Sequence, residues 1–118
     1  MTTIHLPAGA PGARILGFGV YRPRRRVTND ELAQMMDTND EWIQGRVGIA
    51  ERRWAEPDET LVEMAVAAGG KALAASGLDA SDVDLVLMAT TSPPTAIPGL
   101  APQVAYQLGL PRPGAFDI

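Results

Sequence analysis

The sequence predicts an α/β domain with a largely parallel or mixed sheet and covering helices. Strand-like and helix-like segments alternate along its 118 residues, which is the pattern of this fold class. Apolar residues make up 46% of the chain and are mostly small, so layers can approach closely. Residues 83–89 (VDLVLMA) form a nearly continuous apolar run, typical of a strand covered on both faces.

Residues 13–21 (ARILGFGVY) predict the first strand, which ends before Pro23. Gly17 and Gly19 lie inside it and allow another backbone to come close. A basic run follows, made of Arg22, Arg24, Arg25 and Arg26. We interpret it as a solvated loop flanking the strand; the alternative is a patch that attracts an acidic partner.

Three Thr-x-x-Glu segments have the capping-box pattern that opens helices. Residues 28–31 predict a short helix to about residue 36, and residues 38–41 predict a second to about residue 44. Residues 49–54 are an edge strand or an extended loop. Residues 60–63 open a longer helix to about Ser76, closed by Gly77 as the left-handed residue.

The longer helix carries a narrow face of small residues, Val62, Ala65, Ala68, Ala72 and Ala75. The pair at residues 69–70, both glycine, weakens this helix, and we expect tight packing against a neighbour to compensate.

The rest of the chain predicts one further strand–helix–strand unit. One more turn is expected around Ser81, before the strand at residues 83–89. A helix spans residues 100–108, with Pro102 in its first turn and Gly109 closing it. Residues 114–118 (GAFDI) begin another strand.

Composition excludes several classes of protein. The net charge of −4 argues against a general nucleic-acid binder, and no apolar stretch approaches the roughly 20 residues of a membrane helix. The chain has no cysteine, so it offers neither a disulfide nor a thiolate nucleophile. Residues 1–12 do not have the pattern of a secretion signal. We expect a flexible lead-in there and a cytoplasmic protein.

A self-contained active site is not evident. No metal-spaced His/Cys cluster, nucleotide-binding glycine loop or Gly-x-Ser-x-Gly elbow is present. His5, the single histidine, lies in the lead-in and is interpreted as incidental. Asp117 could be a catalytic carboxylate, but its apolar strand context favours a structural role.

Trp42 and Arg46 are the strongest candidate ligand-binding residues. They lie four apart on a short predicted helix and therefore project from one face. An indole ring beside a guanidinium suits a planar aromatic ligand that carries phosphate, such as an adenine nucleotide. The alternative places Trp42 in the core with Arg46 extended along the surface, and spacing alone favours that alternative.

The stretch DTNDEWIQGRVGIAERR resembles a motif of the β-ketoacyl-acyl-carrier-protein synthase III family, of the thiolase superfamily. ILGFGVYRPRRRVTNDEL resembles the opening strand of that family, VDLVLMATTSPPTAIPGLAPQVAYQLGL its central strand with the following loop and helix, and GAFDI the strand before the nucleophile. The match covers about residues 13–118 in order. It implies the N-terminal half-domain of a thiolase-like fold, with layers in the order αβαβα and a mixed sheet.

The resemblance also implies roles for residues of this chain. Thr38, Trp42 and Arg46 fall where the family contacts coenzyme A at the mouth of its substrate tunnel. Ile97 falls where a side chain reaches across the homodimer to line the acyl pocket of the partner. The family often has Phe there, so Ile97 implies room for a longer or more branched primer. Val47 replaces the usual Thr near the tunnel mouth.

The implied reaction is the decarboxylative condensation of an acyl-CoA primer with malonyl-acyl-carrier protein, initiating fatty-acid or polyketide synthesis. The catalytic Cys, His and Asn of the family are expected beyond Ile118, in a C-terminal part of the same enzyme, so this chain alone is expected to be inactive. No cofactor is implied, since acyl-CoA is a substrate. Two alternatives remain: a non-catalytic CoA-binding or interaction module, and another starter or ester-forming enzyme of the superfamily.

Overall fold

The structure, a computed structural model, describes residues 12–118. His5 and all but the last residue of the predicted lead-in lie outside the described residues. The elements are β1 (Arg25–Thr28), α1 (Asn29–Ala33), α2 (Asp40–Val47), β2 (Glu51–Trp54), α3 (Leu61–Ser76), the 3₁₀ turn η1 (Ala80–Asp82), β3 (Leu85–Met88), α4 (Ala101–Gln107) and β4 (Gly114–Asp117).

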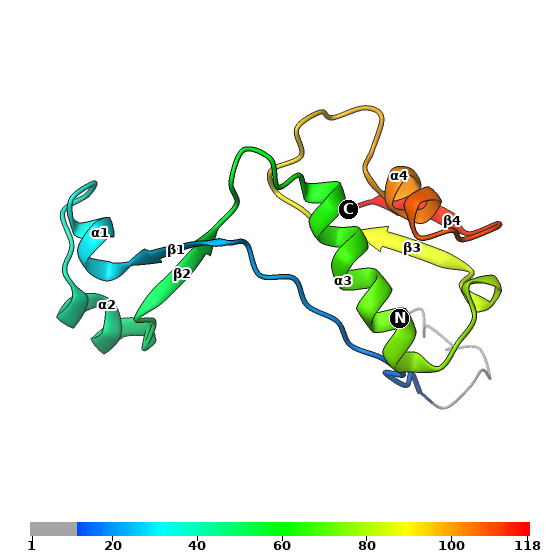
Figure 1. The fold of residues 1–118 in the computed structure, drawn as a ribbon, viewed down its shortest axis with the longest axis horizontal. Coiled ribbons are helices and arrows are strands. Elements are labelled where there is room, and N and C mark those ends of the chain that lie inside the picture. The colour runs from blue at the N-terminus through cyan, green and yellow to red at the C-terminus, as the bar shows by residue number, and fades with distance from the viewer. Residues whose placement is uncertain (1–11) are drawn as a thin grey trace, which may run out of the picture.

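These elements form two lobes (Figure 1). The hairpin lobe, residues 25–54, is an antiparallel pair of strands, β1 and β2, with α1 and α2 between them in sequence. The layered lobe, residues 61–117, contains α3, β3, α4 and β4. The radius of gyration is 19.0 Å. A compact domain of about 100 residues has a radius of roughly 13 Å, so the lobes do not close into one globule.

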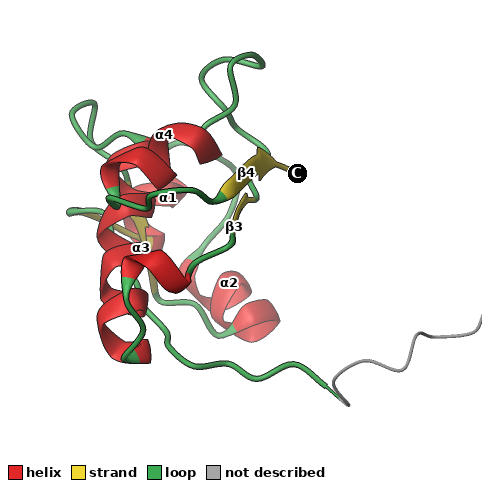
Figure 2. Cartoon of the chain, turned by 90° about the vertical axis from the view of Figure 1, so that its right-hand side faces the viewer, coloured by secondary structure: helices red, strands yellow, loops and turns green. Residues whose placement is uncertain are grey.

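The layered lobe is a two-stranded parallel sheet with helices on one face. β3 pairs with β4 from Leu85↔Gly114 to Met88↔Asp117. Figure 2 shows the two strands side by side, with α3 and α4 on the same side of them. The core on that side centres on Val62, Leu100 and Val104, and Val86 and Met88 of β3 pack against it. The predicted parallel α/β unit is confirmed.

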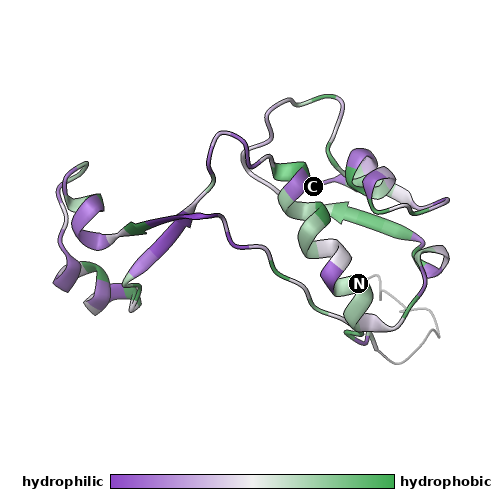
Figure 3. Ribbon diagram, viewed as in Figure 1, coloured by the Kyte–Doolittle hydropathy of each residue, from purple (hydrophilic) through white to green (hydrophobic). Residues whose placement is uncertain are grey.

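The other face of this sheet is open. Leu85, Leu87 and Phe116 alternate with the core-facing residues and remain about half exposed, at 49%, 53% and 51%. Figure 3 shows β3 as a hydrophobic strand, in contrast to the hydrophilic β2 of the other lobe. The expectation that residues 83–89 are covered on both faces is therefore wrong for the described residues. An apolar face of this kind is a surface that proteins normally cover.

Residues 13–21, which were predicted to form the first strand, do not form one. They run as extended chain along α3 (Figure 1), but no strand ladder forms there among the described residues. The predicted close approach is confirmed, since a Cβ built on Gly17 would lie 2.2 Å from the carbonyl oxygen of Ala72. At Gly19 it would lie 2.2 Å from that of Ala68. The segment has the sequence of a strand, but none of the strands in residues 12–118 pairs with it.

The helix ends agree with the sequence where capping chemistry is unambiguous. Thr60 and Glu63 form the reciprocal capping box of α3, and Gly77 follows it at φ 72°. Gly109 has φ 70° after α4, whose first turn contains proline. Leu108 packs against Gly69, where a Cβ would come within 3.1 Å of its Cδ1, so the predicted tight packing is confirmed. None of the helices in residues 12–118 combines the length and apolar character needed to cross a bilayer.

The two chain segments that connect the lobes are tied together by Glu59. This carboxylate is 7% exposed and accepts hydrogen bonds from the Tyr21 hydroxyl, the Arg24 backbone N–H at 3.1 Å and the Glu56 backbone N–H at 2.8 Å. The Tyr21 hydroxyl, followed by the two backbone donors, lowers the pKa of Glu59 below its usual range. One buried anion therefore fixes where the hairpin lobe leaves and rejoins the layered lobe.

The basic run is largely neutralised within the chain. Arg24 pairs with Asp58 at 2.5 Å, Arg26 pairs with Glu51 at 3.2 Å, and Arg25 pairs with Glu31. Arg25 and Arg26 also belong to β1, not to a loop. These internal ion pairs favour a structural interpretation of the run over a docking patch for an acidic partner.

Candidate ligand-binding site

The short helix α2 carries the candidate ligand-binding residues. Its N-cap is Asn39, whose side-chain oxygen accepts from the Trp42 backbone N–H at 2.8 Å. The sequence pattern pointed to Thr38 instead, but Asn is the stronger N-cap and lies one residue closer. The helix also continues past Gly45 to Val47, because the left-handed C-cap is Gly48, at φ 68°.

Trp42 and Arg46 form an exposed pair on this helix. The guanidinium carbon of Arg46 lies 5.3 Å from the centroid of the Trp42 ring, within cation–π range. Trp42 is 57% exposed, and among residues 12–118 no carboxylate pairs with Arg46. The alternative that Trp42 fills the core is therefore wrong. An exposed ring face beside an unpaired cation can stack on a planar ring and contact a phosphate.

α2 is held mainly by polar contacts. Its one buried residue is Ile43, at 7% exposure, so apolar packing alone restrains its orientation weakly. The main contacts come from the side chain of Asn29, which is 1% exposed. Its Nδ2 donates to Asp40 Oδ1 at 2.7 Å and to the Ile49 carbonyl at 2.8 Å, and its Oδ1 accepts from Arg52 Nη2 at 2.5 Å. We call these four groups the Asn29 cluster.

The Asn29 cluster joins every element of the hairpin lobe. Asn29 begins α1, Asp40 begins α2, Ile49 follows α2, and Arg52 lies in β2. Arg52 also donates to the Val27 carbonyl at 3.4 Å, which brings β1 into the cluster. Sequence reasoning missed Asn29 and Arg52 as supporting residues, because their partners are 11 to 25 positions away and no helical or strand periodicity links them.

The charge of Asp40 is stabilised where it stands. Its Oδ2 accepts from Gln44 Nε2 at 2.6 Å, one turn along the helix. The Gln44 amide, followed by the Asn29 amide, lowers the pKa of the Asp40 carboxyl. The negative charge of Asp40, at the first residue of α2, also interacts favourably with the positive end of the helix dipole.

Thr38 lies immediately before the cap, and its hydroxyl oxygen is buried. That oxygen has no hydrogen-bond partner within residues 12–118. Val47 ends α2 and is 62% exposed. The predicted contact of Thr38 with coenzyme A stays a prediction, as does the placement of Val47 near the tunnel mouth.

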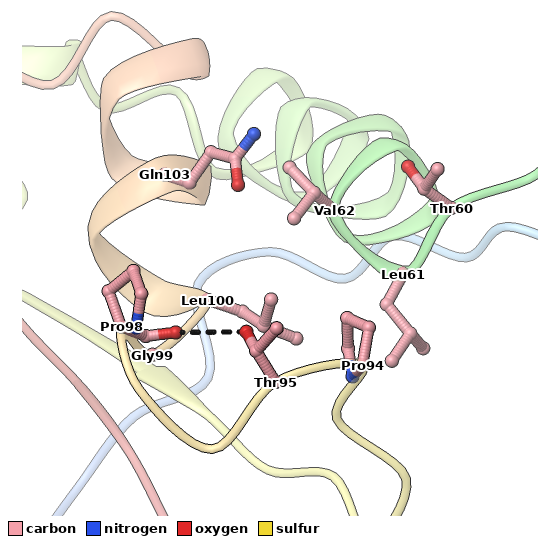
Figure 4. A pocket seen from close by; sticks show the side chains of 9 residues that line it. All are labelled: Thr60, Leu61, Val62, Pro94, Thr95, Pro98, Gly99, Leu100 and Gln103. Carbon is pink, nitrogen blue, oxygen red and sulfur yellow. Dashed lines mark hydrogen bonds between the residues drawn. The ribbon is translucent and has the colours of Figure 1, made fainter.

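Ile97 lies in the loop between β3 and α4 and is 88% exposed. A hollow of about 260 Å³ opens beside this loop, between the starts of α3 and α4 (Figure 4). Leu61, Pro94, Thr95 and Pro98 contribute to its wall, and Ile97 does not. An apolar side chain this exposed is available to a neighbouring surface. Ile97 is on the layered lobe and α2 on the hairpin lobe, so the structure does not bring the two predicted sites together (Figure 1).

Asp117 has a structural role, as its strand context predicts. Its Oδ2 accepts from the Leu100 N–H at 2.6 Å and its Oδ1 from the Ala101 N–H at 2.7 Å. The carboxylate therefore caps α4 from the neighbouring strand β4. Gly99 makes room for it, since a Cβ there would lie 2.9 Å from Asp117 Oδ2.

Comparison with known proteins gives a consistent result. No family model matches the chain. It is 47% identical over all 118 residues to a beta-ketoacyl-[acyl-carrier-protein] synthase III of Streptomyces coelicolor, and covers 34% of that protein. It is 46% identical over its whole length to the mycobacterial beta-ketoacyl-[acyl-carrier-protein] synthase III of Mycobacterium avium, and covers 35% of it. The chain thus spans about a third of the length of the curated relatives it matches.

Solved structures share its fold. The priming β-ketosynthase of the R1128 polyketide biosynthetic pathway superposes with a TM-score of 0.83 at 45% identity, over 89% of this chain and 31% of that one. The 3-oxoacyl-[acyl-carrier-protein] synthase III of Aquifex aeolicus gives 0.82 at 42% identity, over 91% of this chain and 34% of that one. A tetronic acid condensing enzyme gives 0.73 at 28% identity, over 87% of this chain and 33% of that one. The fold is the thiolase-like α/β fold in every case.

Proposed function

We propose that this chain supplies the coenzyme A-binding helix of a condensing acyltransferase. It is 47% identical over all 118 residues to a beta-ketoacyl-[acyl-carrier-protein] synthase III, and 89% of it superposes on a priming β-ketosynthase. The observation that carries the proposal is the exposed Trp42–Arg46 pair, which lies in the stretch DTNDEWIQGRVGIAERR that resembles a motif of the family. Its ring is positioned to stack on the adenine of acyl-CoA, and its guanidinium to contact a phosphate.

The whole protein would transfer an acyl primer from coenzyme A to a cysteine thiolate and condense it with malonyl-acyl-carrier protein, releasing carbon dioxide. This chain contains no cysteine, so the nucleophile would come from elsewhere in the protein. Binding the nucleotide far from the reacting thioester holds the acyl group in place while the chemistry proceeds. The homodimer, the carrier-protein partner and the cytoplasmic location stay predictions of the resemblance.

The test compares two thioesters in the full-length protein. Trp42→Ala is expected to raise the KM for an acyl-CoA by roughly 5- to 150-fold, because stacking of a base on an aromatic ring is worth about 1–3 kcal/mol. The same variant is expected to leave the KM for the acyl-pantetheine thioester, which lacks the nucleotide, unchanged. An equal effect on both thioesters would contradict the proposal.

Trp54→Ala provides a matched control. Trp54 is the other tryptophan of the chain and also faces an arginine, with Arg25 Cζ 5.2 Å from its ring. It lies in β2, outside the helix that carries the proposed site. Its loss is therefore expected to leave acyl-CoA selectivity as it was.

We also propose that Ile97 sets primer preference by contacting the acyl pocket of a second copy. Its 88% exposure on the β3–α4 loop supports a role at an interface. Replacing it with a larger ring, Ile97→Phe, is expected to shift preference in the full-length enzyme from branched or longer primers toward acetyl. Unchanged relative kcat/KM values across a primer series would exclude this role.

A further inference from the structure

The rotation of α2 about its own axis decides whether the Trp42–Arg46 pair faces a ligand. Eight residues make up the helix, and Ile43 is the only one of them that is buried. A helix held by one apolar side chain can rotate about that contact, so another restraint is needed. Trp42 and Arg46 do not supply it, because both side chains are exposed.

The Asn29 cluster provides that restraint at both ends of the helix. Asp40, at the start of α2, and the carbonyl of Ile49, just after its end, both accept from the same amide nitrogen, at 2.7 Å and 2.8 Å. Together with the packing of Ile43, contacts at both ends of the helix restrict its tilt and its rotation. The amide is itself held in place, since its oxygen accepts from Arg52 of β2 at 2.5 Å.

The amide of asparagine matches the three partners at this position. Both donors of its amide group and its oxygen are engaged, and the side chain is 1% exposed. A carboxylate there could not donate to Asp40 or to the Ile49 carbonyl, and an alanine would remove all three hydrogen bonds of the cluster. The partners of position 29 therefore require a side chain that donates two hydrogen bonds and accepts one, as a single amide group does.

We propose that Asn29 is a positioning residue for the ligand face of α2, acting through Asp40 and the Ile49 carbonyl without touching the ligand. The inference rests on the proposed function, because the ligand face is the Trp42–Arg46 pair. It adds that affinity for the nucleotide portion of acyl-CoA depends on a buried amide on the opposite side of the helix.

The experiment uses Asn29→Asp in the full-length protein. This substitution keeps size and shape, and the new carboxylate can pair with Arg52, which favours folding. It also places a second carboxylate against Asp40, which pushes the start of α2 away. The KM for an acyl-CoA is expected to rise on the order of 10-fold or more, with kcat and the KM for the matching acyl-pantetheine unchanged.

A reversed pair then separates positioning from general damage. In Asn29→Asp combined with Asp40→Asn, the amide and the carboxylate exchange places and the contact between α1 and α2 is restored. Part of the lost acyl-CoA affinity is expected to return, because the carboxylate at position 29 still cannot donate to the Ile49 carbonyl. Asp30→Asn is the control, at the neighbouring position on α1, where the side chain is exposed and forms no hydrogen bond to another described residue.

The outcomes distinguish this inference from the function on which it rests. If Trp42→Ala shows no selective loss for acyl-CoA, the proposed function fails. Where Trp42→Ala raises the KM for acyl-CoA selectively, three results for Asn29→Asp would overturn the positioning role. These are an unchanged KM for acyl-CoA, an equal fall in kcat for both thioesters, or no recovery of acyl-CoA affinity in the reversed pair. If Asn29→Asp does not fold, Arg52→Lys decides in its place: a selective rise in acyl-CoA KM of several-fold supports the role, and no such rise overturns it.

Discussion

The two lobes of this chain are held together by different forces. The hairpin lobe buries Val27, Ile43 and the amide of Asn29, and its helices are held by hydrogen bonds to that amide. The layered lobe is held by an apolar core around Val62, Leu100 and Val104, and it leaves one sheet face open. The lobe with the candidate site is thus organised by directional contacts. The lobe that supports it is organised by close packing, which is sensitive to volume.

The largest expected effect tests the packing of the layered lobe. In Gly19→Ala, the new Cβ would lie 2.2 Å from the Ala68 carbonyl oxygen, a backbone atom that cannot move alone. We expect the full-length protein to lose about 3 kcal/mol or more of its free energy of unfolding, the upper range for overpacking. Denaturant unfolding measures it. Gly12→Ala, where nothing lies within 4 Å, is the control, and equal stability of the two variants would contradict close packing along α3.

The next effect tests the join between β4 and α4. Asp117→Ala removes the acceptor of two backbone N–H groups, at 2.6 and 2.7 Å. Charged hydrogen bonds are worth about 1.5–3 kcal/mol, and we expect a loss of about 2 kcal/mol in the free energy of unfolding. Asp117→Asn keeps one acceptor and is expected to lose about half as much in the same denaturation experiment. If both variants are as stable as the parent, the carboxylate does not cap α4.

A smaller effect tests the carboxylate between the lobes. The pKa of Glu59 is lowered in the folded protein, chiefly by the Tyr21 hydroxyl, so the folded pKa lies below the ordinary value of 4.5. The stability from this group is therefore present above about pH 4.5 and is lost as the pH falls through the folded pKa. Melting curves of the parent and Glu59→Gln are expected to differ at pH 7 and to converge at lower pH.

Tyr21→Phe provides a check on the cause of that pH dependence. It removes the largest contribution to the lowered pKa of Glu59 and leaves the carboxylate in place. The acid-dependent part of the stability is expected to shrink. A difference between parent and Glu59→Gln that is constant from pH 7 to pH 3 would show that the carboxylate is not responsible.

The smallest expected effect is a gain in stability, and it concerns the hairpin lobe. Gly45 lies inside α2, and a Cβ there would meet nothing within 4 Å. Gly45→Ala is expected to add about 0.5–1 kcal/mol to the free energy of unfolding, because alanine loses less backbone entropy in a helix. Thermal melting measures the gain. A loss of stability would mean that α2 is packed as tightly as α3.

Capping chemistry and apolar periodicity predicted most of the layered lobe. These signals depend on residues only a few positions apart, so the sequence pattern and the structure agree. They are the Thr60–Glu63 capping box, Gly77, Pro102 and the strand predicted at residues 114–118. Two failures share one cause. Residues 13–21 and the outer face of β3 have the sequence of buried strands, yet no described residue covers or pairs with them.

The candidate site was predictable in part. The spacing of Trp42 and Arg46 predicted a shared face, and the structure confirms it. Spacing did not predict that the ring is exposed, which depends on where Ile43 packs. It also did not predict the support from Asn29 and Arg52, because a hydrogen bond across 23 residues leaves no periodic trace in the sequence.

The hydrogen bonds to Glu59 affect which changes in length the hairpin lobe can accept. Residues 21–24 and 56–59 meet at one carboxylate, so the hairpin lobe begins and ends at the same point of the layered lobe. Residues 25–54 are therefore a cassette with adjoining ends. A change in their length therefore need not alter the register of β3 with β4 in the layered lobe.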